Sequence, residues 1–62
     1  MPFVSVKLLK GRSQEQKREL AKAITDAMER ICSAPRQGTM VVFEEYERQD
    51  WSVGGQLVAD RT

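Results

Sequence analysis

The sequence contains no histidine, a single cysteine and no long apolar run, and each absence excludes a class of protein. One cysteine cannot form an intramolecular disulfide, and without histidine the usual zinc-ligand spacings are missing as well. The longest apolar runs cover a few residues, whereas a helix that spans a bilayer needs roughly 20. No apolar segment typical of a signal peptide follows the start, so we expect a soluble, cytoplasmic protein without a metal site.

The charges are also nearly balanced, since ten Lys and Arg residues face nine Asp and Glu residues, for a formal net charge of +1. This balance predicts neither a nucleic acid nor a membrane surface as partner. The 62 residues form one expected domain, residues 1–62. A domain of this size buries only roughly 60% of the surface of its unfolded chain. Small domains compensate with disulfides, metals or oligomerisation, and only oligomerisation remains here.

Hydrophobic periodicity predicts a strand, a long helix and a second strand. Polar and apolar residues alternate over residues 2–9, and the valine-rich content favours a strand. Ser13 and Gln16 form a capping-box pattern. From Gln14 to about Cys32, apolar residues recur every three or four positions and predict a helix whose apolar stripe is Leu20, Ile24, Ala27, Met28 and Ile31. Residues 39–46, "TMVVFEEY", alternate again and predict the second strand.

These elements together predict an α/β protein built on one βαβ unit with two parallel strands. A helix of this length runs ~28 Å, which matches the ~25 Å of a seven- or eight-residue strand and so returns the chain along the sheet. Gly54 and Gly55 lie between short apolar pieces and predict a small C-terminal hairpin. A two-stranded sheet leaves two open edges and little core, so we expect pairing with other copies.

Few groups in this sequence can transfer protons at neutral pH. Cys32 is interpreted as a small buried hydrophobic residue, and Glu44 and Glu45 point to opposite faces of a strand, so they cannot act as a dyad. The amine at the chain start remains, because an α-amino group has a pKa near 7.7–8.0. Removal of Met1 exposes the secondary amine of Pro2 as a potential base. The alternative interpretation is that Pro2 is only the inert first residue of a strand.

Three segments in register resemble the 4-oxalocrotonate tautomerase family: Pro2 itself, "GRSQEQK" before the helix and "WSVGGQL" near the end. An Ala-Pro pair after the helix adds to the resemblance, which covers nearly the whole chain. The resemblance implies a tautomerase-like α/β (α+β) fold, in which a βαβ unit with a short C-terminal hairpin dimerises into a four-stranded sheet. Three such dimers make a homohexamer, most simply as a trimer of dimers.

The resemblance also implies an activity. Members of this family are isomerases that interconvert enol and keto forms of 2-oxo acids, such as 2-hydroxymuconate from the degradation of aromatic compounds. They use no cofactor and no metal, and the proline exposed by removal of the initiator methionine is the general base. The implied partners are therefore a small enol or keto acid and further copies of the chain.

Carried over residue by residue, the resemblance assigns roles to four positions. Pro2 matches the catalytic base, and Arg12 matches the arginine that binds the distal carboxylate of the substrate and withdraws electron density. A guanidinium suits this role because its planar fork binds a carboxylate through two hydrogen bonds. Trp51 stands where the family has an aromatic residue, usually Phe, that forms an apolar wall of the pocket. Met40 stands where the family has a second arginine, and methionine cannot donate a hydrogen bond.

The departure at Met40 leaves several hypotheses open. Arg36 is one candidate to replace the missing guanidinium, and Arg48 or Arg61 of a neighbouring subunit are others, although each also fits a solvated surface charge. A monoacid or an arylpyruvate-type enol is then a better expected substrate than 2-hydroxymuconate. Two further alternatives are a hetero-oligomer in which a similar sister subunit provides the arginine, and an oligomeric family member without catalytic activity.

Overall fold

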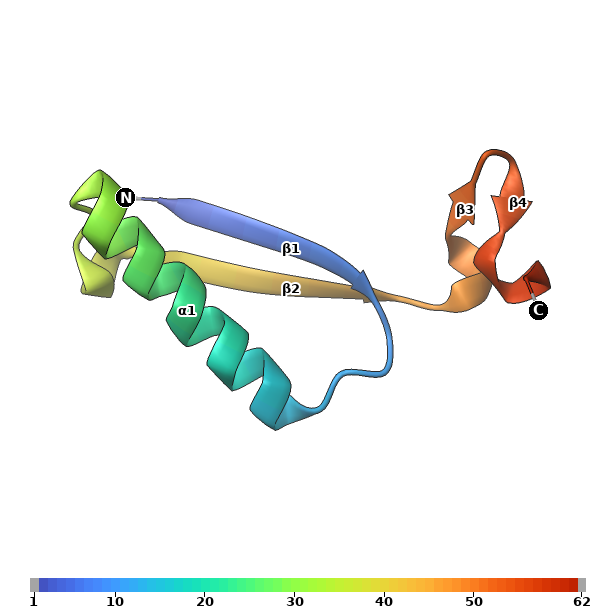
Figure 1. Ribbon diagram of the computed structural model, residues 1–62, viewed down its shortest axis with the longest axis horizontal. Helices are drawn as coiled ribbons and strands as arrows, with labels where there is room; N and C mark the ends of the chain where they lie inside the picture. Colours follow the sequence, from blue (N-terminus) through green and yellow to red (C-terminus); the bar gives the residue numbers. More distant parts are fainter. Residues whose placement is uncertain (1, 62) are drawn as a thin grey trace.

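The computed structural model describes residues 2–61 and confirms the predicted order of strand, helix and strand (Figure 1). The elements are β1 (Phe3–Leu9), α1 (Gln14–Cys32), β2 (Met40–Tyr46), β3 (Ser52–Val53) and β4 (Gln56–Leu57). Three short 3-10 helices connect them: η1 (Arg36–Gly38), η2 (Arg48–Asp50) and η3 (Val58–Asp60). Met1, whose removal the sequence predicts, lies outside the described residues.

Strands β1 and β2 are parallel neighbours along their whole length, with Phe3 opposite Met40 at one end and Leu9 opposite Tyr46 at the other. The backbone pairing continues past both ends, because Met40 N–H donates to the Pro2 carbonyl at 3.0 Å and Lys10 N–H donates to the Tyr46 carbonyl at 2.9 Å. We call the end at Phe3 and Met40 the amino end of the sheet, and the end at Leu9 and Tyr46 its carboxyl end. The predicted βαβ unit with parallel strands is therefore confirmed.

Helix α1 begins and ends with defined caps. Ser13 Oγ accepts a hydrogen bond from Gln16 N–H at 3.1 Å, and Gln16 Oε1 accepts one from Ser13 N–H at 2.8 Å, which confirms the capping box. At the other end Ser33 adopts a left-handed conformation with φ 57°, and its N–H donates to the Glu29 carbonyl at 3.1 Å. Within residues 2–61, no helix combines the length and the apolarity that crossing a bilayer requires.

The helix covers one face of the sheet, mainly over β2, and leaves the other face open (Figure 1). The half-buried residues Val4, Val6, Val41 and Phe43 alternate with exposed ones, which identifies the face toward α1. An ion pair of 2.6 Å between Lys17 Nζ and Glu45 Oε1 joins the start of the helix to the same face. This covered face is thus where the helix layer and the sheet layer meet.

The face of α1 that packs on the sheet is rotated from the stripe expected from periodicity. Its half-buried residues are Lys17, Ala21, Ile24, Thr25, Asp26, Ala27 and Met28. Leu20 and Ile31, which belong to the predicted stripe, are 41% and 67% exposed. Cys32, predicted to be buried, is exposed, and that prediction is wrong for the single chain. A sheet of two strands is too narrow to cover the whole apolar side of a 19-residue helix.

The chain exposes more surface than a folded monomer of its mass. Its accessible area is 4773 Å², whereas a compact 7.1 kDa protein exposes roughly 4,100 Å². Its radius of gyration is 14.7 Å, against about 10.6 Å for a compact chain of this length. Among the described residues only Ala34 and Val58 are buried hydrophobic residues, each still 9% exposed, and they lie at opposite ends of the chain's fold. Such a chain has much apolar area left for contact with partners.

We expect the thermal stability of this protein to depend on its concentration. If the exposed apolar side chains become buried between copies, mass action raises the midpoint of unfolding as protein is added. The measurement is a series of melts over an about hundredfold range of protein concentration, with sedimentation to follow the mass. A constant midpoint, together with a sedimenting species of 7.1 kDa, would contradict this expectation.

Candidate functional site

The residues predicted to form the site lie at the two opposite ends of the sheet. Pro2, Met40 and Arg36 are at the amino end, while Arg12 and Trp51 are at the carboxyl end. The seven residues of β1 separate the two groups by about 23 Å. The described part of the chain contains no pocket. The structure therefore brings Pro2 next to Met40, but it does not bring Pro2 next to Arg12 within one chain.

At the amino end, Pro2 takes part in the strand pairing through its carbonyl group. Met40 N–H donates to that carbonyl at 3.0 Å, so the strand pairing makes no use of the proline nitrogen. Phe3, the register partner of Met40, is 62% exposed, and Met40 is 45% exposed. The surface beside Pro2 is consequently apolar in this chain.

Arg36 also lies near the amino end, but its charge is directed to the helix. Its Nη1 atom lies 2.6 Å from Asp26 Oδ1 and 3.1 Å from Glu29 Oε1. The hydrogen bond from Arg36, followed by that from Lys22, lowers the pKa of the Asp26 carboxyl below its usual value. The same carboxylate raises the pKa of the Arg36 guanidinium. That Arg36 replaces the arginine missing at position 40 stays a prediction.

At the carboxyl end, Arg12 has most of its donors available. The chain leaves β1 through Gly11, whose φ of 132° lies in a region that residues with a side chain rarely adopt. Arg12 Nη1 then donates to the Leu9 carbonyl at 3.2 Å, and within residues 2–61 no carboxylate forms an ion pair with this arginine. A guanidinium has five N–H donors, so Arg12 can still bind an anion.

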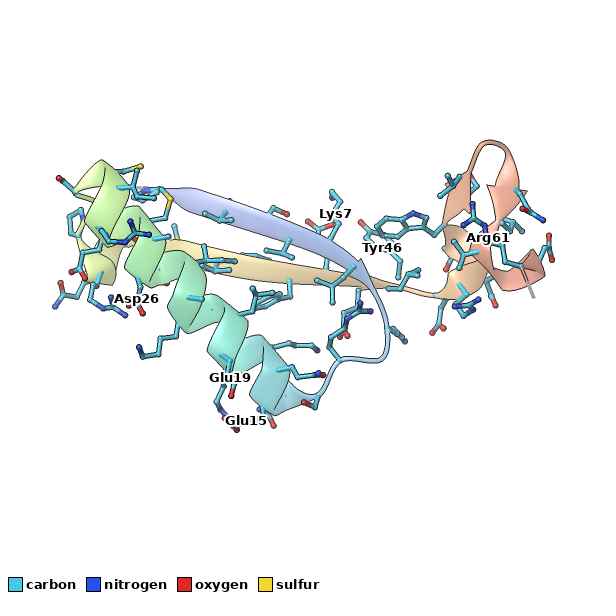
Figure 2. All side chains as sticks on the ribbon, viewed as in Figure 1. Lys7, Glu15, Glu19, Asp26, Tyr46 and Arg61 are labelled. Atoms are coloured by element: carbon cyan, nitrogen blue, oxygen red, sulfur yellow. The ribbon has the colours of Figure 1, made fainter. Side chains whose placement is uncertain are left out.

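Trp51 is fixed beside the same end by the C-terminal hairpin. Its ring packs edge to face on Tyr46, the last residue of β2, with centroids 5.8 Å apart. Its carbonyl accepts a hydrogen bond from Val58 N–H at 2.8 Å, and Arg48 Nη2 donates to the Val58 carbonyl at 3.0 Å. Arg48 thus has a structural contact of its own. The predicted hairpin is present, with Gly54 and Gly55 at its turn, and Arg61 lies at this distant end of the molecule (Figure 2).

A polar cluster on the open face of the sheet was not found from the sequence. The Glu44 carboxylate accepts hydrogen bonds from Lys7 Nζ at 2.9 Å, Tyr46 Oη at 2.8 Å and Ser5 Oγ at 3.1 Å. Lys7 and Tyr46 project from the side of the sheet opposite to α1 (Figure 2). Glu45 instead pairs with Lys17 of the helix, which confirms that the two glutamates point to opposite faces. The sequence signal for this cluster is the alternating pattern of β1 and β2. Together with the parallel register, this pattern places the residues of the cluster on one face of the sheet.

This cluster gives the folded chain a defined pH dependence. The hydrogen bond from Lys7, then those from Tyr46 and Ser5, lower the pKa of Glu44 from 4.5 to about 2. Because the folded value is the lower one, the stabilisation is present above pH 4.5 and is lost as the pH falls toward about 2. We expect Glu44→Gln to reduce the slope of unfolding free energy against pH in this window, measured by urea unfolding.

Glu19→Gln is the matched control for this measurement, because it removes the same charge from the outer side of α1 (Figure 2). A Glu44 carboxyl that titrates at the ordinary value of 4.5 in a carbon-13 NMR experiment would contradict the prediction.

Comparison with known proteins identifies the family of this fold. The family model described as "Tautomerase enzyme" matches residues 2–61, so the chain belongs to the tautomerase family. It is 39% identical over 61 residues to a Bacillus cereus protein named "Probable tautomerase", and the match covers 98% of this chain and all of that protein. This establishes the family to which the sequence resemblance pointed.

Two solved structures have the same fold. The crystal structure of YwhB, described as a homologue of 4-oxalocrotonate tautomerase, superposes with a TM-score of 0.95 at 34% identity and covers 98% of this chain and 100% of that chain. A 4-oxalocrotonate tautomerase from Chloroflexus aurantiacus, described as a heterohexamer, has a TM-score of 0.91 at 33% identity, with 97% of each chain covered. Among residues 2–61, no group of three His, Cys, Asp or Glu side chains could hold a metal ion.

Proposed function

We propose that this protein is a tautomerase that interconverts the enol and keto forms of 2-oxo acids, with Pro2 as the general base and Arg12 as the carboxylate anchor. The observation that carries the proposal is the placement of Pro2 directly before β1, where its carbonyl group takes part in the strand pairing and its nitrogen does not. Membership of the tautomerase family supports it.

The chemistry follows from the properties of a terminal secondary amine. An α-amino group has a pKa close to physiological pH, and an apolar pocket or a neighbouring cation lowers it further, so part of the amine is unprotonated. The neutral amine takes the proton of the enol hydroxyl and returns a proton to a carbon of the conjugated system. No atom is gained or lost and nothing is oxidised, so the reaction needs no cofactor. While Met1 is attached, the Pro2 nitrogen is an amide and is not a base.

A complete site requires two copies of the chain. Within residues 2–61, strand β1 is paired with β2 alone, so its other edge is open there. If two β1 edges pair in antiparallel orientation, a four-stranded sheet forms and the amino end of one copy meets the carboxyl end of the other. Pro2 and Met40 of one copy then face Arg12 and Trp51 of its partner. A hexamer of three such pairs buries further apolar surface, and the assembly of the Chloroflexus relative supports this hexamer.

A second arrangement has a specific observation in its favour. Met40 gives this chain no donor at the position where the resemblance places a second arginine, and the Chloroflexus relative is a heterohexamer. A similar sister chain could provide that cation in a mixed assembly. Full activity of the purified protein as a homo-oligomer would exclude this arrangement, whereas activity that requires a second, similar chain would establish it.

The experiment that tests the proposed function combines an intact-mass measurement with a ketonisation assay. We expect the mass of the chain without Met1, and we expect the conversion of 2-hydroxymuconate or phenylenolpyruvate to be faster than in buffer alone. Retention of Met1 with no rate above buffer on either compound would identify a family member without catalytic activity.

A further inference from the structure

We propose that Tyr46 is a positioning residue for Trp51: its ring fixes the orientation of the indole, and the hydrogen bond from its hydroxyl group to Glu44 fixes the ring. This inference rests on the proposed function, because it takes Trp51 as a wall of the site that two copies share. It adds two residues, Tyr46 and Glu44, that act on the reaction through Trp51 without touching the substrate.

The C-terminal segment that carries Trp51 needs a contact of this kind, because it stands apart from the sheet and the helix (Figure 1). Within residues 2–61, none of its elements (η2, β3, β4 and η3) makes an extensive contact with β1, β2 or α1. Lys10 Nζ lies 2.7 Å from Glu47 Oε1 and joins the segment to the sheet, but these side chains are 60% and 50% exposed. An ion pair so exposed to water holds its partners weakly.

Tyr46 links the sheet to the indole of Trp51. As the last residue of β2, Tyr46 has a backbone that belongs to the sheet. Its ring meets the indole edge to face, with centroids 5.8 Å apart and ring planes at 74°, and both residues are half-buried. Such a pair contributes more than the area that it buries, and the contribution depends on the geometry of the two rings. The contact therefore favours one orientation of the indole.

The ring of Tyr46 is held in turn by Glu44. Tyr46 Oη donates to the Glu44 carboxylate at 2.8 Å, and Lys7 Nζ and Ser5 Oγ of β1 donate to the same carboxylate at 2.9 Å and 3.1 Å. The hydrogen bond from Lys7, then those from Tyr46 and Ser5, lower the pKa of Glu44 to about 2, so the acceptor is ionised at neutral pH. Connected contacts thus run from β1 through Tyr46 to Trp51, on the open side of the sheet where Figure 2 shows Lys7 and Tyr46.

The first part of the test observes the indole directly, because Trp51 is the only tryptophan of the chain. Its fluorescence anisotropy and its quenching by acrylamide are measured in the folded, assembled protein. Tyr46→Leu removes the ring, and we expect the quenching constant to rise about twofold or more and the anisotropy to fall. Tyr46→Phe keeps the ring but loses the hydroxyl group, and we expect values between those of the wild type and Tyr46→Leu.

The second part of the test asks whether Tyr46 acts on the reaction through Trp51. We expect Tyr46→Leu to lower kcat/KM for ketonisation by about 2- to 10-fold, the effect of one aromatic pair. In a Trp51→Leu background, the same substitution should change kcat/KM much less, because no indole is left to position. A role of Tyr46 in stability alone would make the two losses equal.

Phe43→Leu is the matched control, because it removes an aromatic ring from the opposite face of the same strand. We expect it to lower the stability and to leave the quenching of Trp51 unchanged. Quenching equal to the wild type in either Tyr46 variant, the same rise in Phe43→Leu, or equal losses of kcat/KM with and without the indole would overturn the inference. If the wild type shows no ketonisation but both Tyr46 variants raise the quenching, the proposed function fails and the positioning of Trp51 stands.

Discussion

Pro2→Ala is expected to lower kcat/KM for ketonisation by about 10²- to 10⁴-fold, the usual contribution of a positioned general base. The substitution replaces the cyclic secondary amine by a primary amine on a more flexible residue, so both the basicity and the placement of the nitrogen change. The carbonyl group that accepts from Met40 N–H at 3.0 Å is retained, so we expect the sheet to be unaffected. The measurement is the initial rate with phenylenolpyruvate, followed by its ultraviolet absorbance.

The control is the only other proline of the chain, Pro35. Its carbonyl accepts from Thr39 Oγ1 at 2.8 Å and from Gly38 N–H at 3.1 Å, and alanine at this φ of −65° preserves both bonds. Pro35→Ala should therefore retain the wild-type rate. Equal rates for the wild-type and Pro2→Ala proteins, with Met1 removed from both, would contradict the role of Pro2.

Arg12→Gln is expected to lower kcat/KM by about 10- to 100-fold, because it removes charged hydrogen bonds to the substrate carboxylate. The kcat/KM of Arg12→Lys should lie between those of Arg12→Gln and the wild type, since lysine keeps the charge but lacks the planar fork of the guanidinium. An enol ester, which has no carboxylate charge, should show little difference among the three proteins. The measurement is a comparison of KM and kcat for the acid and its ester.

Arg18→Gln provides the matched control, because among residues 2–61 the one ion pair of Arg18 is with Glu15, at 2.9 Å, on the exposed side of α1. If Arg18→Gln lowered kcat/KM as much as Arg12→Gln does, the effect would come from the net charge of the protein in general. A loss in Arg12→Gln that is equal for acid and ester would contradict the assignment of Arg12 as anchor.

The elements of this fold could be predicted because each depends on residues close in sequence. The capping box of Ser13 and Gln16 fixes the start of α1, and Pro35, which cannot continue a helix, marks its end. The alternation of the two strands predicts which residues share a face, and Gly54 with Gly55 predicts the hairpin. These are local rules, and the structure confirms them.

The contacts that decide the chemistry depend on the position of one element relative to another. The pairing of Arg36 with Asp26 and Glu29 follows from the path of the chain after the helix, which helical spacing does not predict. The Glu44 cluster needs the register of two strands that are far apart in sequence. Likewise, the periodicity of α1 predicts an apolar side but not its rotation over a narrow sheet, so the exposure of Ile31 could not be predicted.

The most direct test of the central claim, that Pro2 of one copy acts with Arg12 of another, is subunit complementation. The Pro2→Ala and Arg12→Gln proteins are unfolded together in equal amounts, refolded and assayed. In a mixed pair, the site that combines Pro2 of the Arg12→Gln chain with Arg12 of the Pro2→Ala chain is intact, and the other site lacks both residues. Random pairing makes half of the pairs mixed, and each has one intact site of two. We therefore predict about one quarter of the wild-type rate per chain. A mixture that is no more active than the two variants assayed separately would contradict the shared site.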